Sequence, residues 1–436
     1  MSAAAPRRRF AEAIATRRLD NGARFFVLEN RFNPTVSISG SMFAGPLFAP
    51  PSRRLLAAAT AGELLKGTSR RSKLEIAESL ESRGASLAVS ADASDPVGVD
   101  IVGSALSRDV ELLLDTLAEV LREPSFPEEE LEKEKKRLVG AIRQQEDNTG
   151  ARAWAAATRH IYPEGHPMRR RTAAERIASV ESLGREELAA YHRTRYGAAN
   201  FHVAVAGDVD AGTMLDGLAR RFSDWRPGPA REVPGLEVPS PSPAREDVVL
   251  PDKPSADVVL MEPSDLSRPS GDFLACSLAN SALGQSSLTS RLGLRVRDTE
   301  GLTYGIHSSF AASHVAGPFA VTLTVKPESR DAAVASALDE IRKFLDGGMT
   351  DKELVDEKSA RVGRFLVDLA SSSGLASAID TAVYYGFGIG YLDEFPDLVS
   401  AVTRAQAQEA FARRVHPERF TIVSAGSFGL DPRSAP

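Results

Sequence analysis

Two kinds of hydrophobic spacing alternate along the chain. Four short segments alternate apolar and polar positions or form brief apolar runs after an Asn-Gly turn, both of which are typical of strands. They are residues 25–28, 36–39, 87–90 and 97–101. Residues 110–121 and 128–145 instead carry apolar residues at helical spacing, and Pro127 stands where a helix start tolerates it. This pattern predicts an α+β unit with a mostly antiparallel sheet and helices packed on one face.

The pattern occurs twice. Ser107-Arg108-Asp109 reappears as Ser329-Arg330-Asp331, and each copy precedes an apolar helical stretch. Later in each half, the apolar run from Phe201 to Gly207 matches the run from Phe420 to Gly426. A further match pairs Leu131–Lys135 with Leu354–Lys358, and all three matches lie close to 220 residues apart. A constant offset indicates an internal repeat, so we expect two tandem homologous domains.

A proline-rich stretch separates the halves. Six prolines stand between Pro227 and Pro243 with almost no apolar periodicity between them, which favours extended and semi-rigid backbone. We therefore predict an N-terminal domain at 15–226, a linker at 227–244 and a C-terminal homologous domain at 245–430.

Composition excludes several classes of protein. The formal net charge of −6 argues against a nucleic-acid partner, and the short arginine clusters are interpreted as solvated surface. The single cysteine, Cys276, lies in an apolar stretch and is expected to be a small buried residue. No apolar run approaches the roughly 18–20 residues that a membrane span needs. The N-terminus carries no secretory signal as written, so we expect a cytoplasmic protein, or a periplasmic one if a signal was removed.

No self-contained active site is visible in the sequence. Neither H-E-x-x-H nor H-x-x-E-H occurs, and there is no G-x-S-x-G elbow and no phosphate-binding glycine motif. His160 and His166 are six residues apart, which does not place them on one helical face, and we interpret them as loop or surface residues. His202 lies in a predicted strand and is expected to be a hydrogen-bonded structural residue.

The tandem α+β copies, the N-terminal Leu19-Asp20-Asn21-Gly22 and the Lys66-Gly67-Thr68 after a helix resemble the pitrilysin/insulinase family of zinc metallopeptidases. The resemblance covers about residues 15–430. It implies an H-x-x-E-H zinc motif on the helix before Lys66, and a glutamate ligand on the later long helix. The matching positions are all without ligand atoms: Ala58, Ala61, Gly62 and Ala141. The resemblance therefore implies that this chain holds no cofactor.

The second half keeps a different family feature. The family's arginine–tyrosine pair, which contacts substrate across the chamber from zinc, maps onto Arg297 and Tyr304. Arg295 is a nearby rival for the arginine position. Gly301 is expected to cap the intervening helix. A guanidinium and a phenol are hydrogen-bond donors of the type that a developing oxyanion needs.

The resemblance implies the non-zinc-binding subunit of a heterodimeric peptidase. In such enzymes one chain carries the zinc motif and the other carries the arginine–tyrosine pair, and a peptide is bound between them. Two alternatives stay open at this point. One is a purely structural subunit similar to the core proteins of the respiratory bc1 complex, and the other is a standalone peptide-binding protein.

Overall fold

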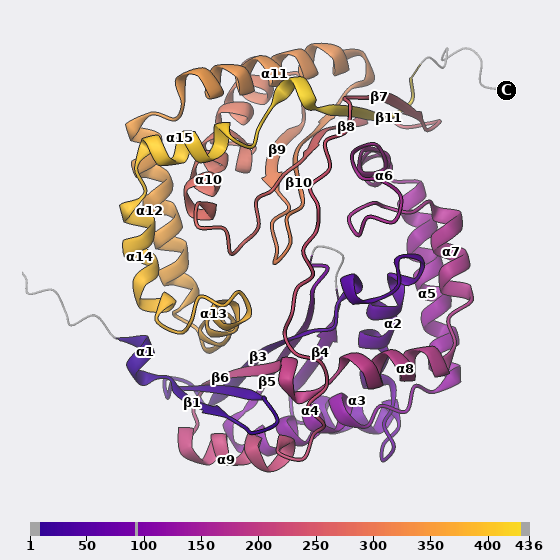
Figure 1. Ribbon diagram of the computed structural model, residues 1–436, viewed down its shortest axis with the longest axis vertical. Helices are drawn as coiled ribbons and strands as arrows, with labels where there is room; N and C mark the ends of the chain where they lie inside the picture. Colours follow the sequence, from indigo (N-terminus) through magenta and orange to yellow (C-terminus); the bar gives the residue numbers. More distant parts are fainter. Residues whose placement is uncertain (1–8, 92–94, 429–436) are drawn as a thin grey trace, which may run out of the picture. The chain divides into compact units, whose positions relative to one another are not determined.

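The computed structural model describes residues 9–91 and 95–428 (Figure 1). It contains two sheets, each in its own compact unit. The first unit comprises residues 1–137, 179–234 and 362–397, and the second comprises 138–178, 235–361 and 398–436. Neither unit is continuous in sequence, so each one is completed by segments from both halves of the chain.

The first sheet has six strands in the order β1-β2-β6-β3-β5-β4, and every neighbouring pair is antiparallel except β2 and β6. Its strands are β1 Ala15–Arg18, β2 Arg24–Glu29, β3 Thr35–Phe43, β4 Ser86–Ser90, β5 Gly98–Leu106 and β6 Phe201–Gly207. Strands β2 to β5 lie where the hydrophobic pattern predicts strands, whereas β1 was not predicted. The mostly antiparallel arrangement is confirmed.

Helices α4 Val110–Arg122 and α9 Ala211–Phe222 contact each other and cover one face of this sheet (Figure 1). The ring of Phe222 on α9 packs against Phe25 and Phe201, with ring centroids 5.9 and 5.0 Å apart. The opposite face takes helix α13 Ser372–Tyr384, whose Ile379 and Leu375 pack against Leu28 and Ala204. Helices thus lie on both faces, because a sheet that is apolar on both sides needs two covering layers.

The second sheet has five strands in the order β7-β11-β8-β10-β9, with β7 and β11 as its single parallel pair. Its strands are β7 Arg245–Val249, β8 Ala256–Pro263, β9 Gly305–Phe310, β10 Pro318–Val325 and β11 Thr421–Gly426. This order reproduces β2-β6-β3-β5-β4 of the first sheet strand for strand. The repeat expected from the sequence is therefore present in the fold.

One face of the second sheet packs on helices of the second half. Phe319 of β10 contacts Phe411 of α15 Arg404–Ala412, and Phe411 contacts Phe344 of α11 Arg330–Gly347. Helix α10 Phe273–Asn280 packs against α15. The other face takes α6 Thr149–Ile161 from the first half. Each half of the chain thus supplies one helix to the other half's sheet.

Eight further helices lie in the described part of the chain. They are α1 Phe10–Ala13, α2 Leu55–Glu63, α3 Lys73–Glu81, α5 Glu128–Glu146, α7 Ala173–Glu181, α8 Arg185–Arg195, α12 Asp351–Asp368 and α14 Tyr391–Ala401. Residues 226–244 contain no helix or strand. The predicted domains at 15–226 and 245–430, with a linker at 227–244, describe the two copies of the repeat and stay a prediction. The two compact units have other boundaries along the chain.

Candidate functional site

Arg297 lies on a π-helical segment, Gly293–Thr299, and Tyr304 lies directly before strand β9. Gly301 adopts a φ of +64°, and its N–H donates to the carbonyl of Arg297 at 3.2 Å. The N–H of Leu302 donates to the carbonyl of Val296 at 2.9 Å. A left-handed residue with these two bonds closes the helix end, as expected for Gly301. The closed end fixes how the backbone carries Tyr304 back toward Arg297.

The two side chains present unused donors. Arg297 Nε donates to the backbone carbonyl of Tyr304 at 3.3 Å, and Nη1 donates to Asp298 Oδ1 at 2.7 Å. The N–H of Tyr304 donates to the carbonyl of Thr324 at 2.9 Å, which fixes its backbone. Its side chain is 62% exposed, and its hydroxyl has no partner in the part of the chain that the structure describes. The phenol and the remaining guanidinium N–H groups are therefore available to a ligand.

Arg295, the rival arginine, is occupied. Its guanidinium lies 2.6 Å from Asp339, 3.1 Å from Glu300 and 3.2 Å from Glu340. Burial lowers the pKa of Arg295, but these carboxylates outweigh that effect and leave its pKa well above the usual value. Arg295 fastens the π-helical segment to α11, so Arg297 is the arginine with free donors.

The four positions that the resemblance assigns to the zinc motif lie on helices α2 and α5. Ala58 and Gly62 are half-buried on α2, and Ala61 is fully buried there. Ala141 is half-buried on α5. Among residues 9–91 and 95–428, no group of three His, Cys, Asp or Glu side chains could hold a metal ion. These side chains do not fit zinc, because methyl groups and hydrogen atoms cannot coordinate it.

A pair of glutamates, Glu63 of α2 and Glu134 of α5, lies beside these positions. Glu63 is fully buried, and neither of its carboxylate oxygens has a hydrogen-bond partner. Burial, followed by the nearby Glu134 carboxylate, raises the pKa of Glu63 to about 7. A Cβ on Gly62 would lie 3.6 Å from Oε1 of Glu134, which is itself buried and paired with Arg137. The helical spacing of Glu134 from the buried Leu131 was the available signal.

The Lys66-Gly67-Thr68 turn has a structural explanation. Gly67 has a φ of +152°, and a Cβ there would approach Pro127 and Ser125 to 3.0 Å. The buried Thr68 hydroxyl donates to Glu119, whose carboxylate also pairs with Arg71. The turn therefore anchors the end of α2 to α4, a role that requires no metal.

The remaining candidates are structural. His202 is fully buried, with Nδ1 accepting from Arg231 Nη1 at 3.0 Å and Nε2 lying 2.6 Å from Asp380 Oδ1. His160 is exposed at the end of α6 and pairs with Glu246 at 2.7 Å, so it is a surface residue, as one of the two predicted alternatives has it, and it lies on a helix. Cys276 is fully buried, and this burial raises its pKa to about 12. The predicted roles of His202 and Cys276 are confirmed.

No helix in the described part of the chain is both long enough and apolar enough to cross a membrane.

Two family models match the chain. Residues 63–170 match the Insulinase (Peptidase family M16) model, and residues 182–361 match the Peptidase M16 inactive domain model. Together the two matches span more than half of the 436 residues. The match to the Insulinase model begins at residue 63, directly after the degenerate zinc positions on α2. The match to the inactive-domain model includes Arg297 and Tyr304.

Curated relatives carry both peptidase and non-peptidase names. An uncharacterized zinc protease of Streptomyces coelicolor is 22% identical over 80% of this chain and 77% of its own length. One from Mycobacterium tuberculosis is 26% identical over 72% of this chain and 71% of its own length. The non-peptidase homologue YmxG of Helicobacter pylori is 24% identical over 77% of this chain and 76% of its own length.

Solved structures share the fold along almost the whole chain. A peptidase M16 inactive domain from Pseudomonas fluorescens has a TM-score of 0.84 and 26% identity, covering 95% of this chain and 98% of that one. A protease from Helicobacter pylori has a TM-score of 0.83 at 15% identity, covering 94% of this chain and 99% of that one. With the repeated α+β fold and the two family models, these likenesses agree that the chain belongs to the insulinase family of peptidases, family M16, as a member of its inactive-domain type.

Proposed function

We propose that this chain is the non-zinc-binding subunit of a two-chain metallopeptidase and supplies Arg297 and Tyr304 to an active site whose zinc is held by a homologous partner. The observation that carries the proposal is a contrast within one chain. The side chains at the four zinc-motif positions offer no ligand atoms, whereas the half-buried Arg297 and the exposed Tyr304 have unused donors. A chain that had lost all catalytic function would have no need of these donors.

The hydrogen-bond donors of Arg297 and Tyr304 suit peptide hydrolysis. Zinc in the partner would polarise the scissile carbonyl and activate water. Arg297 and Tyr304 would hold the substrate carbonyl and donate hydrogen bonds to the oxygen as negative charge develops on it. The backbone bond from Tyr304 to Thr324 fixes the position from which the phenol extends.

Strand β9 offers a place for the peptide itself. It lies at an edge of the second sheet and begins at Gly305, directly after Tyr304. The Ile306 N–H of this strand already donates to Ser287 Oγ and the Ser308 carbonyl already accepts from Asn280 Nδ2, each at 3.1 Å, so a peptide would pair only with the start of the strand, where it would run past the phenol. Substrate binding and oxyanion stabilisation would then come from adjacent residues.

The competing function is a structural subunit with no part in catalysis. The Helicobacter pylori relative named a non-peptidase homologue gives that alternative its support. Such a subunit would tolerate the loss of the Arg297 and Tyr304 donors.

Assembly is tested by mixing. The test uses this chain and a homologous chain, sought in the same genome, that carries an intact H-x-x-E-H motif. This chain alone is expected to contain no stoichiometric zinc by elemental analysis and to cleave no peptide. The mixture should sediment as a dimer and hydrolyse a quenched fluorescent peptide. Separate sedimentation at micromolar concentration, or one tightly bound zinc in this chain, would contradict the proposal.

The role of Arg297 is tested in the mixture. Arg297→Ala should lower peptide turnover on the order of 10²-fold with dimer formation unchanged, because it removes a donor without breaking a buried contact. Arg404→Ala is the matched control, since Arg404 is an exposed arginine with a similar ion pair, to Asp351 at 3.3 Å. Equal turnover for the two variants would support the structural subunit.

A further inference from the structure

Five arginines line a pocket in the second unit, between the end of α5, helix α6 and the start of α7. The pocket has a volume of about 150 Å³. One water molecule needs only about 10–15 Å³ by the same measure, so a polyatomic ion fits. The arginines are Arg152, Arg159, Arg170, Arg171 and Arg176, and Glu146 is the one carboxylate among the lining residues.

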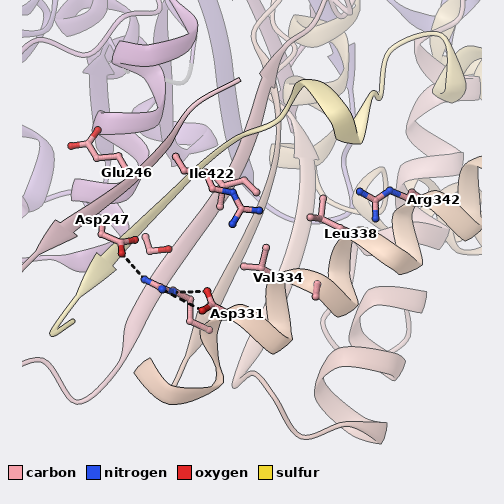
Figure 2. Close-up of a pocket in the computed structure, with 11 residues that line it drawn as sticks. Glu246, Asp247, Asp331, Val334, Leu338, Arg342 and Ile422 are labelled. Atoms are coloured by element: carbon pink, nitrogen blue, oxygen red, sulfur yellow. Dashed lines mark hydrogen bonds and ion pairs between the residues drawn. The ribbon is translucent and has the colours of Figure 1, made fainter. Parts of the chain in front are cut away.

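A larger groove in the same unit does not select a charge in this way. It has a volume of about 630 Å³ and lies between α11 and strands β7 and β11 (Figure 2). Three arginines and three carboxylates line it, and Figure 2 shows Arg330 bonded to Asp247 and Asp331, at 2.8 and 3.0 Å. The charges of this groove balance, whereas those of the pocket beside α6 do not.

Helical spacing places the arginines of α6 and α7 on the pocket. Arg152, Ala155 and Arg159 follow one another at intervals of three and four residues, so they share one face of α6. Ala173 and Arg176 are three residues apart and share a face of α7 in the same way. The alanines on these faces are small, which leaves room between the longer arginine side chains.

The loop between α6 and α7 is fixed against the end of α6. Arg169 Nη1 donates to the carbonyl of Arg159 and, at 2.9 Å, to the carbonyl of Tyr162. The N–H of Arg170 donates to Thr158 Oγ1 at 3.2 Å. These bonds fix the backbone that carries Arg170 into the pocket.

Two of the five arginines have carboxylate partners nearby. Arg152 lies 3.1 Å from Glu146, and Arg171 lies 3.1 Å from Glu175. The single carboxylate that lines the pocket is therefore already paired with Arg152.

Arg159 and Arg176 form no ion pair with any residue that the structure describes. Arg176 Nη1 donates to Gln145 Oε1 at 3.0 Å, and Arg170 Nη2 donates to the same oxygen at 2.7 Å. The shared acceptor belongs to an uncharged amide. It therefore brings two guanidinium groups together without cancelling their charge.

The pKa of Arg176 reflects this positive surrounding. Burial, followed by repulsion from Arg170, lowers the pKa of Arg176 to about 10, and the attraction of Glu146 is the weakest of the three effects. Arg176 is therefore still cationic at neutral pH, and a nearby anion would stabilise it. Thr172 and Ala173 at the start of α7 also line the pocket, and a helix N-terminus adds partial positive charge.

We propose that this pocket binds a phosphate group, held by Arg159, Arg170 and Arg176. A guanidinium offers N–H donors in a fork that matches the oxygens of carboxylates and phosphates. Because these arginines come from α6, the loop and α7, their donors belong to three separate elements. A phosphate has an oxygen for each of them, whereas a carboxylate has only two oxygens. The proposal goes beyond the peptidase role and does not depend on it.

The same chemistry fits free phosphate and the end of a phosphate monoester, so the test uses both. Isothermal titration calorimetry measures binding of sodium phosphate, methyl phosphate and sodium acetate to the full chain, with ionic strength held constant by sodium chloride. Phosphate should bind roughly tenfold more tightly than acetate and should raise the unfolding temperature. Comparable binding of methyl phosphate would assign the site to the phosphate end of a larger molecule, and its exclusion would assign the site to the free ion.

Two variants test the arginines. Arg159→Gln and Arg176→Gln should each weaken phosphate binding roughly tenfold and remove the rise in unfolding temperature. Arg143→Gln is the matched control, because Arg143 is an exposed arginine of α5 outside the pocket and its loss changes the net charge equally. Arg159→Gln keeps the test decisive if Arg176→Gln fails to fold, since the Arg159 guanidinium makes no bond within the described chain.

Three results would overturn the proposal. The first is no binding of phosphate or methyl phosphate at millimolar concentration. The second is equal affinity for phosphate and acetate, which would reflect only a general positive potential. The third is phosphate binding that both Arg159→Gln and Arg176→Gln leave unchanged. Circular dichroism of each variant checks that the fold is intact.

Discussion

At the residue scale, the environment of a side chain decides its chemistry. Histidine often acts in catalysis, but the two ring nitrogens of His202 contact Arg231 and Asp380. Strand periodicity alone was enough to predict a structural histidine there. The partnership of Glu63 and Glu134 could not be predicted in the same way, because it depends on how α2 packs against α5. Sequence patterns report the burial of a residue more readily than the identity of its neighbours.

Glu63 makes folding stability depend on pH. Its carboxyl keeps a proton to about pH 7 in the folded chain, whereas in the unfolded chain it ionises near its ordinary pKa of 4.5. The folded state therefore binds more protons between these values, and the contribution of Glu63 to stability falls as the pH rises through this window. Glu63→Gln should remove this slope, which is on the order of 2 kcal/mol between pH 5 and 8.

The measurement is urea unfolding of wild type and Glu63→Gln at pH 5, 6, 7 and 8. The difference between their free energies of unfolding should change across the series in favour of the variant. Glu75→Gln is the control, because Glu75 is an exposed capping residue whose pKa is lowered by its bonds to Ser72. A pH-independent difference for Glu63→Gln would show that Glu63 ionises normally in the folded chain.

At the element scale, the strands and the long helices follow the hydrophobic pattern, but the destinations of two helices do not. Helix α13 is from the second half and packs on the first sheet, and α6 is from the first half and packs on the second. Periodicity identifies the apolar face of a helix and leaves open which sheet it covers. The helices that pack on the sheet of their own half cover one face of it, as expected. The second face of each sheet is covered by the helix from the other half, α13 or α6.

A polar network fixes α13 on its sheet. Asp380 of α13 accepts from Ser39 and Ser41 at 3.0 and 2.8 Å and lies 2.6 Å from the buried His202. Asp380→Ala removes the carboxylate that faces Nε2 of the buried His202 and accepts from Ser39 and Ser41, and it should destabilise the chain by about 3 kcal/mol. Ser377→Ala, an exposed substitution on the same helix, should have little effect.

Hydrogen exchange provides the specific readout for this network. In Asp380→Ala, the amides of α13 should exchange faster than those of α4 on the opposite face. Uniform acceleration in both helices would show that the network stabilises the fold as a whole and does not anchor α13.

At the scale of the whole molecule, the repeat is visible in the sequence but the exchange between repeats is not. Three matches near one offset were enough to predict two copies of one α+β fold, and the two sheets have the same strand order. The chain passes between the compact units five times, and one of these divisions follows Pro234, inside the predicted linker. The other four fall within continuous helices, where no change of composition marks a boundary.

The exchange predicts that the halves depend on each other for folding. Residues 1–234 contain α6 but lack α13, and residues 235–436 contain α13 but lack α6. Each half expressed alone should bind a hydrophobic dye and lack a cooperative urea transition, because one face of its sheet is uncovered. Co-expression of the two halves should restore a cooperative transition. A cooperative transition in either half alone would contradict this account.

As proposed, this chain contributes chemistry to an active site that it cannot complete alone. The most direct measurement is kcat for peptide hydrolysis by the reconstituted pair carrying Tyr304→Phe, which removes a solvent-exposed hydroxyl and keeps the ring. Tyr385→Phe serves as the control. The account predicts a loss on the order of 10²–10³ in kcat, with dimer assembly and thermal stability unchanged. Wild-type kcat in the Tyr304→Phe pair would contradict it and leave Arg297 and Tyr304 as residues of the fold alone.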